Sequence, residues 1–265
     1  MKDLYSQILK DDLFFIIGPC VLDTEKNAQA IAEKICQLRD KSGVTFIYKA
    51  SFDKANRQSI DSYRGLGLEK SAQILNSIKE KYSLPILTDI HTPDQAQLIG
   101  FADVVQIPAF LSRQTDILVA AGRTNKIVNI KKGQFMSAEQ MKSSAEKVFS
   151  TGNKKVMLTE RGTFFGYGDL VVDFRNISKM KELGLPVVFD ATHSVQKPGG
   201  KGTSSGGARE FIEPYAYASL DFGAKGIFME VHPDPSKALC DGENSVDLQA
   251  LEKIVAGVIK RKRGI

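Results

Sequence analysis

The sequence predicts an α/β fold, a single (β/α)8 TIM barrel with a short N-terminal extension over residues 1–12. Three observations predict it. Eight short apolar runs recur along the chain, and each is followed by polar residues and then by a helical pattern. The 265 residues give about 33 residues for each repeat, which is the length that a strand, a helix and their loops need. No linker separates the repeats, so we expect one domain over residues 1–265.

The eight apolar runs are short, continuous and rich in β-branched and aromatic residues. Such runs are typical of parallel strands that are buried on both faces, whereas a half-exposed strand alternates apolar and polar residues. We therefore expect strands at Leu13–Ile17, Val44–Tyr48, Pro85–Thr88, Val104–Ile107, Ile127–Ile130, Val156–Thr159, Val187–Phe189 and Ile227–Val231.

The segments between the runs carry apolar residues at helical spacing with charged residues opposite, the pattern of amphipathic helices. Ser137, with Gln140 three residues later, is a helix-start pattern. Gly184, just before Pro186, predicts the end of the helix that precedes the seventh strand. The clearest helices are expected at Asn27–Leu38, Glu69–Tyr82 and Asp247–Val258.

An open, doubly wound parallel sheet is the alternative fold. It usually carries a glycine-rich turn after its first strand, and Gly18-Pro19-Cys20 does not have that composition. The richest irregular segment, Pro198–Gly207, reads PGGKGTSSGG, and we expect it to be a mobile loop over the active-site end of the barrel. It lacks the Gly-Lys-Ser/Thr order of a phosphate-binding loop, and a surface connection without a role is the other interpretation.

Composition and charge exclude several functional classes. The chain is 42% hydrophobic and 25% charged, as globular proteins are, and its net charge of +5 is spread along the sequence. We expect no nucleic-acid or membrane partner, while the mild positive excess favours an anionic small molecule. Cys20, Cys36 and Cys240 are too scattered for a disulfide framework, and the N-terminus lacks a signal peptide, so we expect a cytoplasmic protein.

Chemically capable residues stand at or just after the end of each predicted strand. In a TIM barrel the loops that follow the strands build the active site, so these residues are expected to converge on one rim. One or two polar residues in loops carry little information, but a chemically capable residue at the end of all eight strands favours an active site. In chain order they are Cys20, Lys49, Asp89, Gln106, Lys131, Glu160-Arg161, Asp190 with His193, and Glu230 with His232.

One group of residues near these strand ends is cationic. Basic side chains that converge on a barrel mouth bind phosphate or carboxylate, arginine through two parallel hydrogen bonds and lysine as a point charge. A single lysine is usually a solvated surface residue, but Lys49 and Lys131 directly continue buried strands. Lys132 is expected to point outward, because strand side chains alternate. The group comprises Lys49, Lys54, Arg57, Lys131 and Arg161.

A second group combines a thiol, an imidazole and two carboxylates, from Cys20, His193, Glu230 and Asp241. They follow the first, seventh and eighth strands, which closure of the barrel makes neighbours. These donors suit a divalent Zn, Fe, Mn or Co ion, although no CxxC or HExxH spacing supports the assignment. The alternative is a packed Cys20 and a hydrogen-bonded His193.

The residues that end and follow the second strand, YKASFDKANR at positions 48–57, closely resemble the signature of the 3-deoxy-D-manno-octulosonate 8-phosphate synthases. This run is highly specific, and the resemblance extends over residues 13–248. The other matching segments are SYRG at 62–65, DIH at 89–91, QIPAFL at 106–111, RQTD at 113–116, KKGQF at 131–135, RG at 161–162, FGY at 165–167, FDATHS at 189–194, EVHPDP at 230–235 and CDG at 240–242.

The resemblance implies a cytoplasmic homotetramer that condenses phosphoenolpyruvate with D-arabinose 5-phosphate and water, without an organic cofactor. The products are 3-deoxy-D-manno-octulosonate 8-phosphate and phosphate, in the biosynthesis of the lipopolysaccharide inner core. The catalytic groups would be Lys49, Asp89, Lys131 and His193. The phosphoenolpyruvate carboxylate would be held by Lys49, Ser51 and Lys54, its phosphate by Lys131, Gln134, Arg161 and the Ala109 backbone, and the sugar phosphate by Asn56, Arg57 and, from a neighbouring subunit, Arg113.

The family that the chain resembles has a metal-dependent branch with cysteine, and a metal-independent branch with asparagine, at the position of Cys20. Cys20 favours the metal-dependent branch, with the four donors of the second group as ligands. Cys240-Asp241-Gly242 resembles the metal-independent branch, although Glu243 replaces the proline that usually follows there. We predict a bound metal, because Cys20 supplies a ligand and the loop sequence does not.

Two other functions are weighed against this one. The 3-deoxy-D-arabino-heptulosonate 7-phosphate synthases have a similar fold but use erythrose 4-phosphate, and they carry Arg-Thr-Ser-Pro where this chain has Lys54-Ala55-Asn56-Arg57. A non-catalytic barrel that binds a phosphorylated sugar is the second alternative, and the intact set of strand-end residues disfavours it.

Overall fold

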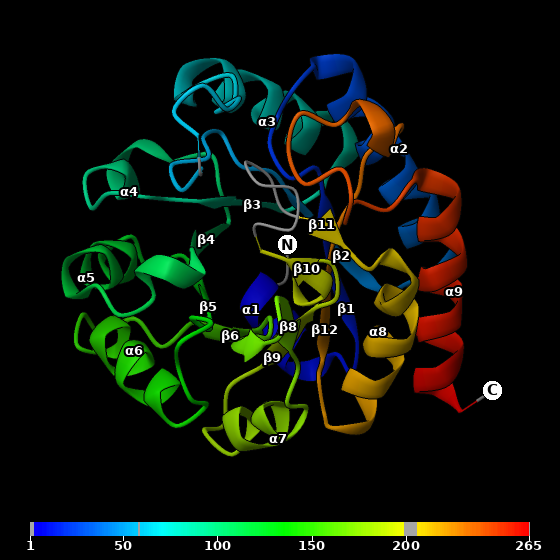
Figure 1. Cartoon of the computed structure of the whole chain (residues 1–265). Helices are drawn as coiled ribbons and strands as arrows, with labels where there is room; N and C mark the ends of the chain where they lie inside the picture. The colour runs from blue at the N-terminus through cyan, green and yellow to red at the C-terminus, as the bar shows by residue number, and fades with distance from the viewer. Residues whose placement is uncertain (1–2, 58, 199–205, 265) are drawn as a thin grey trace.

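Eight parallel strands close into a barrel, as the sequence predicts (Figure 1). The structure, a computed structural model, describes residues 3–57, 59–198 and 206–264. The strands pair in the order β1-β2-β3-β4-β5-β6-β9-β12, and β12 closes the ring against β1. They are β1 (Phe14–Gly18), β2 (Thr45–Lys49), β3 (Ile86–Asp89), β4 (Val104–Ile107), β5 (Ile127–Lys131), β6 (Val156–Glu160), β9 (Val187–Asp190) and β12 (Gly226–Glu230).

A helix follows each barrel strand and contributes to an outer ring, and one further helix, α1, precedes the first strand (Figure 1). None of the described helices is long and apolar enough to cross a membrane. The helices are α1 (Leu4–Lys10), α2 (Glu25–Ser42), α3 (Leu68–Tyr82), α4 (Gln95–Leu98), α5 (Thr115–Arg123), α6 (Gln140–Phe149), α7 (Arg175–Lys181), α8 (Ile212–Asp221) and α9 (Leu248–Arg263), with 3₁₀ turns η1 (Ala109–Leu111), η2 (His193–Val195), η3 (Arg209–Phe211) and η4 (Pro235–Lys237).

The eight predicted strands are confirmed, and each end lies within one residue of its predicted position. The closed ring excludes the open doubly wound sheet. Helix α6 begins at Gln140, three residues after Ser137, and the Gln140 Oε1 atom accepts a hydrogen bond of 3.0 Å from the Ser137 amide. Gly184 has a positive φ of 74°, and its amide donates to Lys181 O at the end of α7, as its predicted role requires.

Two small antiparallel pairs were not predicted. Strands β7 (Thr163–Gly166) and β8 (Asp169–Val171) form a hairpin after β6, and β10 (Gln196–Lys197) pairs with β11 (Gly206–Gly207) after β9. The predicted mobile loop over residues 198–207 connects this second pair, and its residues 199–205 lie outside the described residues.

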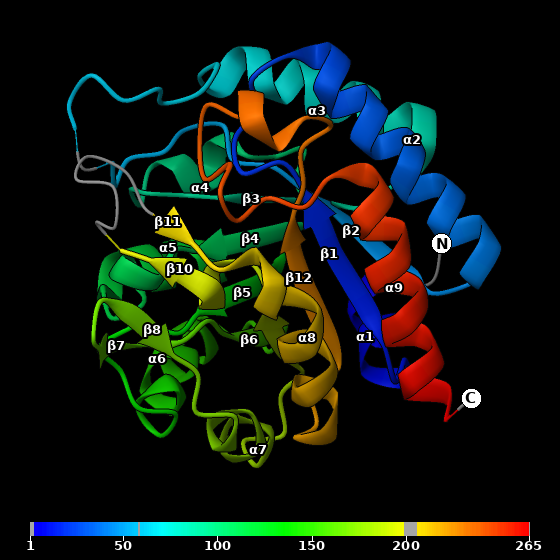
Figure 2. The same cartoon turned by 45° about the vertical axis from the view of Figure 1, so that its right-hand side comes forward.

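Side chains at alternate strand positions point into the barrel, because strand side chains alternate between faces. A buried apolar cluster fills the amino-terminal half of the interior, and Leu4, Tyr5 and Ile8 of α1 pack against it. Helix α1 therefore covers this end of the barrel, opposite to the end where β10 and β11 lie (Figure 2). The interior cluster consists of Phe14, Ile16, Ile47, Leu87, Val104, Ile127, Met157, Val188 and Phe228, together with Ile8.

The same alternation sets the chemistry at the other end. Two positions beyond Ile47, Leu87, Val188 and Phe228 stand Lys49, Asp89, Asp190 and Glu230, so these charged groups occupy the inner face at the carboxyl ends of their strands. On β4, β5 and β6 the positions beyond the apolar cluster are polar but uncharged, and Gln106 is in register with Asp89. Hydrogen bonds between these positions run from Thr159 Oγ1 to Asn129 Oδ1 at 2.7 Å and from Asn129 Nδ2 to Gln106 Oε1 at 3.0 Å.

Candidate active site

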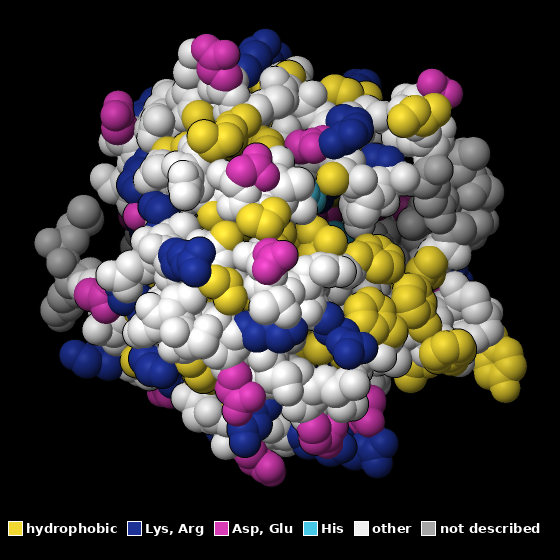
Figure 3. All heavy atoms as spheres, turned by 90° about the vertical axis from the view of Figure 1, so that its left-hand side faces the viewer, with side chains coloured by type: hydrophobic (Ala, Val, Ile, Leu, Met, Phe, Trp, Pro, Cys, Tyr) yellow, Lys and Arg dark blue, Asp and Glu magenta, His cyan; other side chains and the backbone are white. Residues whose placement is uncertain are grey.

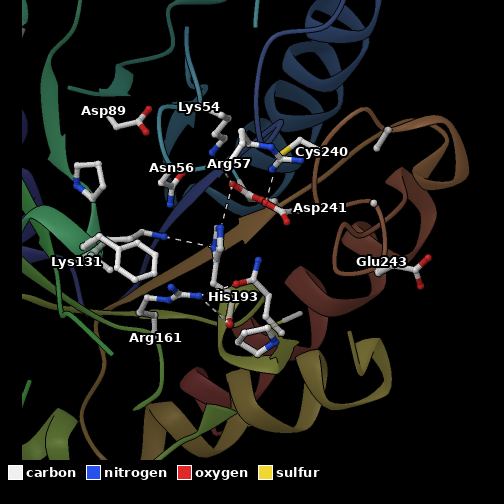
Figure 4. A pocket seen from close by; sticks show the side chains of 18 of the residues that line it. Lys54, Asn56, Arg57, Asp89, Lys131, Arg161, His193, Cys240, Asp241 and Glu243 are labelled. Atoms are coloured by element: carbon white, nitrogen blue, oxygen red, sulfur yellow. Dashed lines mark hydrogen bonds and ion pairs between the residues drawn. The ribbon is translucent and has the colours of Figure 1, made fainter. Parts of the chain in front are cut away.

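A cavity of about 700 Å³ opens at the carboxyl ends of the barrel strands (Figure 4). Its wall combines the strand-end side chains with residues from the loops after β2, β3, β4, β5, β6, β9 and β12. The predicted site residues that line it are Lys49, Lys54, Asn56, Arg57, Asp89, Ala109, Lys131, Gln134, Arg161, His193, Glu230 and Asp241.

Lys49 and Glu230 form a buried ion pair at the base of this cavity. Lys49 Nζ lies 2.9 Å from Glu230 Oε1 and donates a second hydrogen bond of 2.8 Å to Cys20 O. Lys54 Nζ lies 3.9 Å from the same carboxylate oxygen, and His193 Nε2 lies 3.5 Å from it. Burial opposes ionisation of Glu230, but His193 and the two lysines hold the pKa of this carboxyl below its usual range.

Asp89 at the end of β3 pairs with His91. The two side chains are buried, and His91 Nε2 lies 3.4 Å from Asp89 Oδ2. Burial raises the pKa of Asp89. The hydrogen bond and charge of His91, with the charges of Lys54 and Lys49, lower it by more, so the pKa of Asp89 lies below its usual value. Asp89 is therefore held as a carboxylate.

Lys131 at the end of β5 forms an ion pair with Asp190 and lies 3.5 Å from His193 Nδ1. Burial, only partly offset by the charge of Asp190, lowers the pKa of Lys131 to about 8. Asp190 Oδ2 lies 2.6 Å from His193 Nδ1, which fixes the orientation of the imidazole ring. The predicted outward direction of Lys132 is consistent with its place outside the cavity, where it hydrogen-bonds to Met136 O and lies 3.5 Å from Glu160.

Several cavity-lining side chains carry buried polar atoms with no hydrogen-bond partner among the described residues. These atoms are Asp89 Oδ1, His91 Nδ1, Gln134 Oε1, Arg57 Nε and Arg161 Nε. Buried polar atoms in folded proteins are nearly always hydrogen-bonded, so such atoms are available to a bound molecule. Arg161 Nη2 meanwhile donates to Gln196 Oε1 at 2.7 Å, which holds the guanidinium in the wall of the cavity.

The predicted metal donors fall into two overlapping groups that share Asp241. His193, Glu230 and Asp241 bring ligand atoms within 4.8 Å of one another, and so do Cys20, Cys240 and Asp241. Imidazole, carboxylate and thiol donors fit a borderline divalent ion, so the residues that the chain supplies are suitable for the predicted metal. Burial raises the pKa of the Cys20 thiol well above its usual value, and a bound cation would be needed to stabilise its thiolate.

Asp241 reaches this position through a strained turn. It has a φ of 48°, in the left-handed region that non-glycine residues rarely adopt. The amides of Asn244 and Ser245 donate to Asp241 O at 3.0 Å each and hold the turn. A Cβ atom on the next residue, Gly242, would lie 2.4 Å from Pro235 O, so only glycine fits there.

Three predicted site residues do not line the cavity of their own chain: Cys20, Ser51 and Arg113. Cys20 and Ser51 are buried beside it, and Arg113 is exposed. Sequence reasoning did not identify Cys240 as a donor, although it directly precedes Asp241 in the chain. It also gave no role to Gln196, which belongs to the unpredicted strand β10.

The fold and this site together define a TIM-barrel enzyme with a strongly cationic cavity. The chain belongs to the DAHP synthetase I family, whose model matches residues 7–263. It is 54% identical over 247 residues to the 2-dehydro-3-deoxyphosphooctonate aldolase of Desulfatibacillum aliphaticivorans, which covers 92% of this chain and 89% of the relative.

Two further relatives carry the same name. The 2-dehydro-3-deoxyphosphooctonate aldolase of Syntrophotalea carbinolica is 53% identical over 239 residues, covering 90% of this chain and 86% of the relative. That of Geobacter sulfurreducens is 49% identical over 244 residues, covering 92% and 90%. This name is a synonym of 3-deoxy-D-manno-octulosonate 8-phosphate synthase, so the resemblance read from the sequence motifs is confirmed.

Proposed function

We propose that the chain condenses phosphoenolpyruvate with D-arabinose 5-phosphate and water to give 3-deoxy-D-manno-octulosonate 8-phosphate and phosphate. One observation carries the proposal: six cationic side chains from four different parts of the chain line one cavity, together with carboxylates and two imidazoles. Such a cavity suits two anionic substrates, and the relatives that share about half of the residues are named for this product.

In this proposal the cations divide between the two substrates. Lys49 and Lys54, with Ser51, hold the carboxylate of phosphoenolpyruvate. Lys131 and Arg161 hold its phosphate, and the unpartnered Arg161 Nε and Gln134 Oε1 support this role. The sugar phosphate is bound by Asn56 and Arg57 and by Arg113 of a neighbouring subunit; Arg57 Nε also has no hydrogen-bond partner among the residues that the structure describes.

The chemistry needs positioning and charge stabilisation more than covalent catalysis. Carbon 3 of phosphoenolpyruvate attacks the sugar aldehyde, water adds to carbon 2, and cleavage of the C–O bond releases phosphate. Fixed cations hold both anions in line for this step without reorganisation. Asp89 stays ionised, and its free Oδ1 accepts a hydrogen bond from a reacting hydroxyl or water, while Asp190 orients His193 beside the same centre.

We further propose that a Zn, Fe, Mn or Co ion is bound by Cys20, His193, Glu230 and Asp241. When bound, such an ion would polarise the aldehyde oxygen or a water molecule as a Lewis acid. The mixture of imidazole, carboxylate and thiol donors around Asp241 supports this assignment.

The proposal includes a cytoplasmic homotetramer. Three free cysteines suit a reducing compartment. Large apolar side chains, Phe165 and Tyr167 on the β7–β8 hairpin and Phe110 and Phe135 near it, are exposed, and hydrophobic side chains gather on this side of the molecule (Figure 3). A monomer rarely leaves such a group uncovered, so a second copy of the chain is its expected cover.

The direct test is turnover. Purified protein is supplied with phosphoenolpyruvate and either arabinose 5-phosphate or erythrose 4-phosphate, and released phosphate is measured in a coupled assay with elemental analysis of the same sample. We expect phosphate release with arabinose 5-phosphate only. A preference for erythrose 4-phosphate would favour the heptulosonate synthase, and binding without turnover would favour the non-catalytic barrel.

A further inference from the structure

Two thiols from opposite ends of the chain meet beside the cavity. Cys20 follows β1, and Cys240 belongs to the loop after β12; their Sγ atoms lie 2.8 Å apart. Both sulfur atoms also face the same carboxylate oxygen, Asp241 Oδ2, at 3.2 Å from Cys20 and 3.3 Å from Cys240. These two sulfurs and the oxygen lie within 4.8 Å of one another, close enough to serve as donors to one cation.

An arginine side chain also contacts Cys240. Arg57 Nη1 donates a hydrogen bond of 2.9 Å to Cys240 Sγ (Figure 4). Cys240 Sγ therefore faces a polar group as well as the two donors Cys20 and Asp241. A buried thiol that only packs against apolar residues has no such partner.

We propose that Cys240 is a second thiolate ligand of the ion at this site, so that Cys20, Cys240 and Asp241 hold the metal together. This inference rests on the proposed metal dependence. It adds a ligand to the proposed set, because the family resemblance gives Cys20 as the only sulfur ligand. Two thiolates favour Zn²⁺ or Co²⁺ over Mg²⁺ or Mn²⁺, since soft sulfur donors select the softer ions.

The geometry requires one small adjustment. With zinc–sulfur bonds of about 2.3 Å and tetrahedral angles, two sulfurs on one ion stand about 3.8 Å apart. The Sγ atoms must therefore separate by roughly 1 Å from the observed 2.8 Å, which a rotation of the cysteine side chains achieves. His193 and Glu230 form the other donor group, which shares Asp241 with the two cysteines.

Cobalt spectroscopy tests the number of thiolates without reference to activity. Metal-free full-length protein, kept reduced, is titrated with Co²⁺, and the near-ultraviolet sulfur-to-cobalt charge-transfer band is measured. The variants are Cys20→Ser and Cys240→Ser, and Cys36→Ser is the matched control, because Cys36 lies on α2 outside both donor groups. Affinity for Zn²⁺ is measured in parallel by competition with a chromophoric chelator.

We expect Cys20→Ser and Cys240→Ser each to lose about half of the band, and Cys36→Ser to keep it. Loss of a residue that only hydrogen-bonds to a metal ligand typically lowers metal affinity roughly 10–100-fold. Loss of a ligand should cost at least as much, so we expect the Zn²⁺ affinity of Cys240→Ser to fall by at least this factor. A Cys240→Ser band equal to that of the wild type overturns the proposal. If the wild type shows no charge-transfer band, both this proposal and the proposed metal site are wrong. Turnover of arabinose 5-phosphate by the same sample then shows separately whether the proposed condensation is correct.

Alkylation gives a second measurement that needs no variant to fold. Wild-type protein with and without Zn²⁺ is treated with a cysteine alkylating reagent, and modification of each cysteine is followed by mass spectrometry. Zn²⁺ should slow modification of Cys20 and Cys240 several-fold and leave Cys36 unchanged. Protection of Cys20 alone contradicts a role for Cys240 as a ligand.

Discussion

Lys49 Nζ lies 2.9 Å from Glu230 Oε1, although β1 separates β2 from β12 in the barrel. Each side chain is only 1% exposed. Lys54 and His193 face the same carboxylate, at 3.9 Å and 3.5 Å. Glu230 therefore neutralises a buried cation, in addition to its proposed role as a metal ligand.

Lys49→Met should disable the site. It removes a cation from the cavity and leaves Glu230 without its nearest partner, so kcat/KM should fall by at least about 100-fold. The melting temperature should fall too, because breaking a buried ion pair costs about 3–5 kcal/mol. Steady-state kinetics and thermal unfolding measure the two effects. Lys49→Arg keeps the charge and should recover part of the stability; wild-type kinetics in Lys49→Met would contradict the assigned role.

Gly18→Ala should displace the backbone at Lys49 without removing a charge from the site. Gly18 ends β1, and a Cβ atom there would lie 1.8 Å from Lys49 O on the adjacent strand. The strands must move apart, which costs at least about 1–3 kcal/mol and displaces Lys49. We expect a lower melting temperature and lower kcat. Gly100→Ala is the matched control, because nothing lies within 4 Å of its Cβ; equal effects in both variants would exclude the steric explanation.

Asp89→Asn should lower stability in a pH-dependent way. The folded state depresses the pKa of Asp89, so its ionised form stabilises the fold above the unfolded pKa of about 3.9, and this stabilisation is lost as the pH falls. Losing the hydrogen bond to His91 costs about 2 kcal/mol at pH 7. The difference in melting temperature between wild type and variant should be several degrees at pH 7 and shrink below about pH 4.

A surface carboxylate provides the control for Asp89. Asp221 pairs with Arg261 at 2.5 Å, but both side chains are about half exposed. Exposed pairs contribute little, so Asp221→Asn should change the melting temperature by less than about 2 °C at either pH. A constant difference between wild type and Asp89→Asn across the pH range would show that the Asp89 charge does not stabilise the fold.

The barrel strands could be predicted because a strand buried on both faces must be apolar at nearly every position. The β7–β8 hairpin could not. Its turn places Phe165 and Tyr167 at positive φ values of 79° and 54°, and aromatic residues do not signal that conformation in a sequence. Helix α4 has only four residues, too few to show a helical period.

The residues of the site could be predicted in the same way, but their pairings could not. Strand alternation alone places Lys49, Asp89 and Glu230 on the inner rim. Which cation pairs with which carboxylate depends on strand register, which is not visible in the sequence, although closure of β12 against β1 follows from the predicted barrel. The 2.8 Å approach of Cys240 to Cys20 has the same origin, since 220 residues separate the two cysteines in the chain.

Removal of the metal should abolish the activity of the wild type but not that of the Cys20→Asn variant, which we expect to be metal-independent. Chelation should lower turnover by more than about tenfold, since the proposed ion would polarise the reacting oxygen, and Zn²⁺ or Co²⁺ should restore turnover. Cys20→Asn should retain activity in chelator, because asparagine stands at this position in the metal-independent branch. Elemental analysis accompanies each assay. Full activity of a metal-stripped wild type would contradict metal dependence.

Arg113 should act across a subunit boundary. It is exposed and does not line the cavity of its own chain, although it is proposed to bind the sugar phosphate. Arg113→Ala and Lys131→Met should each be nearly inactive, because each lacks one phosphate ligand. In a mixed tetramer, a site formed by Lys131 of an Arg113→Ala chain and Arg113 of a Lys131→Met neighbour is complete.

Co-expression of the two chains with different tags, followed by tandem affinity purification, gives mixed assemblies for assay. At equal proportions about one quarter of the sites should be complete, so turnover should return to about that fraction of wild type. Lys49→Met mixed with Lys131→Met is the control, because both lysines belong to the same chain's cavity and no complete site can form. If the Arg113 mixture stays as inactive as this control, Arg113 serves its own subunit or has no role in binding.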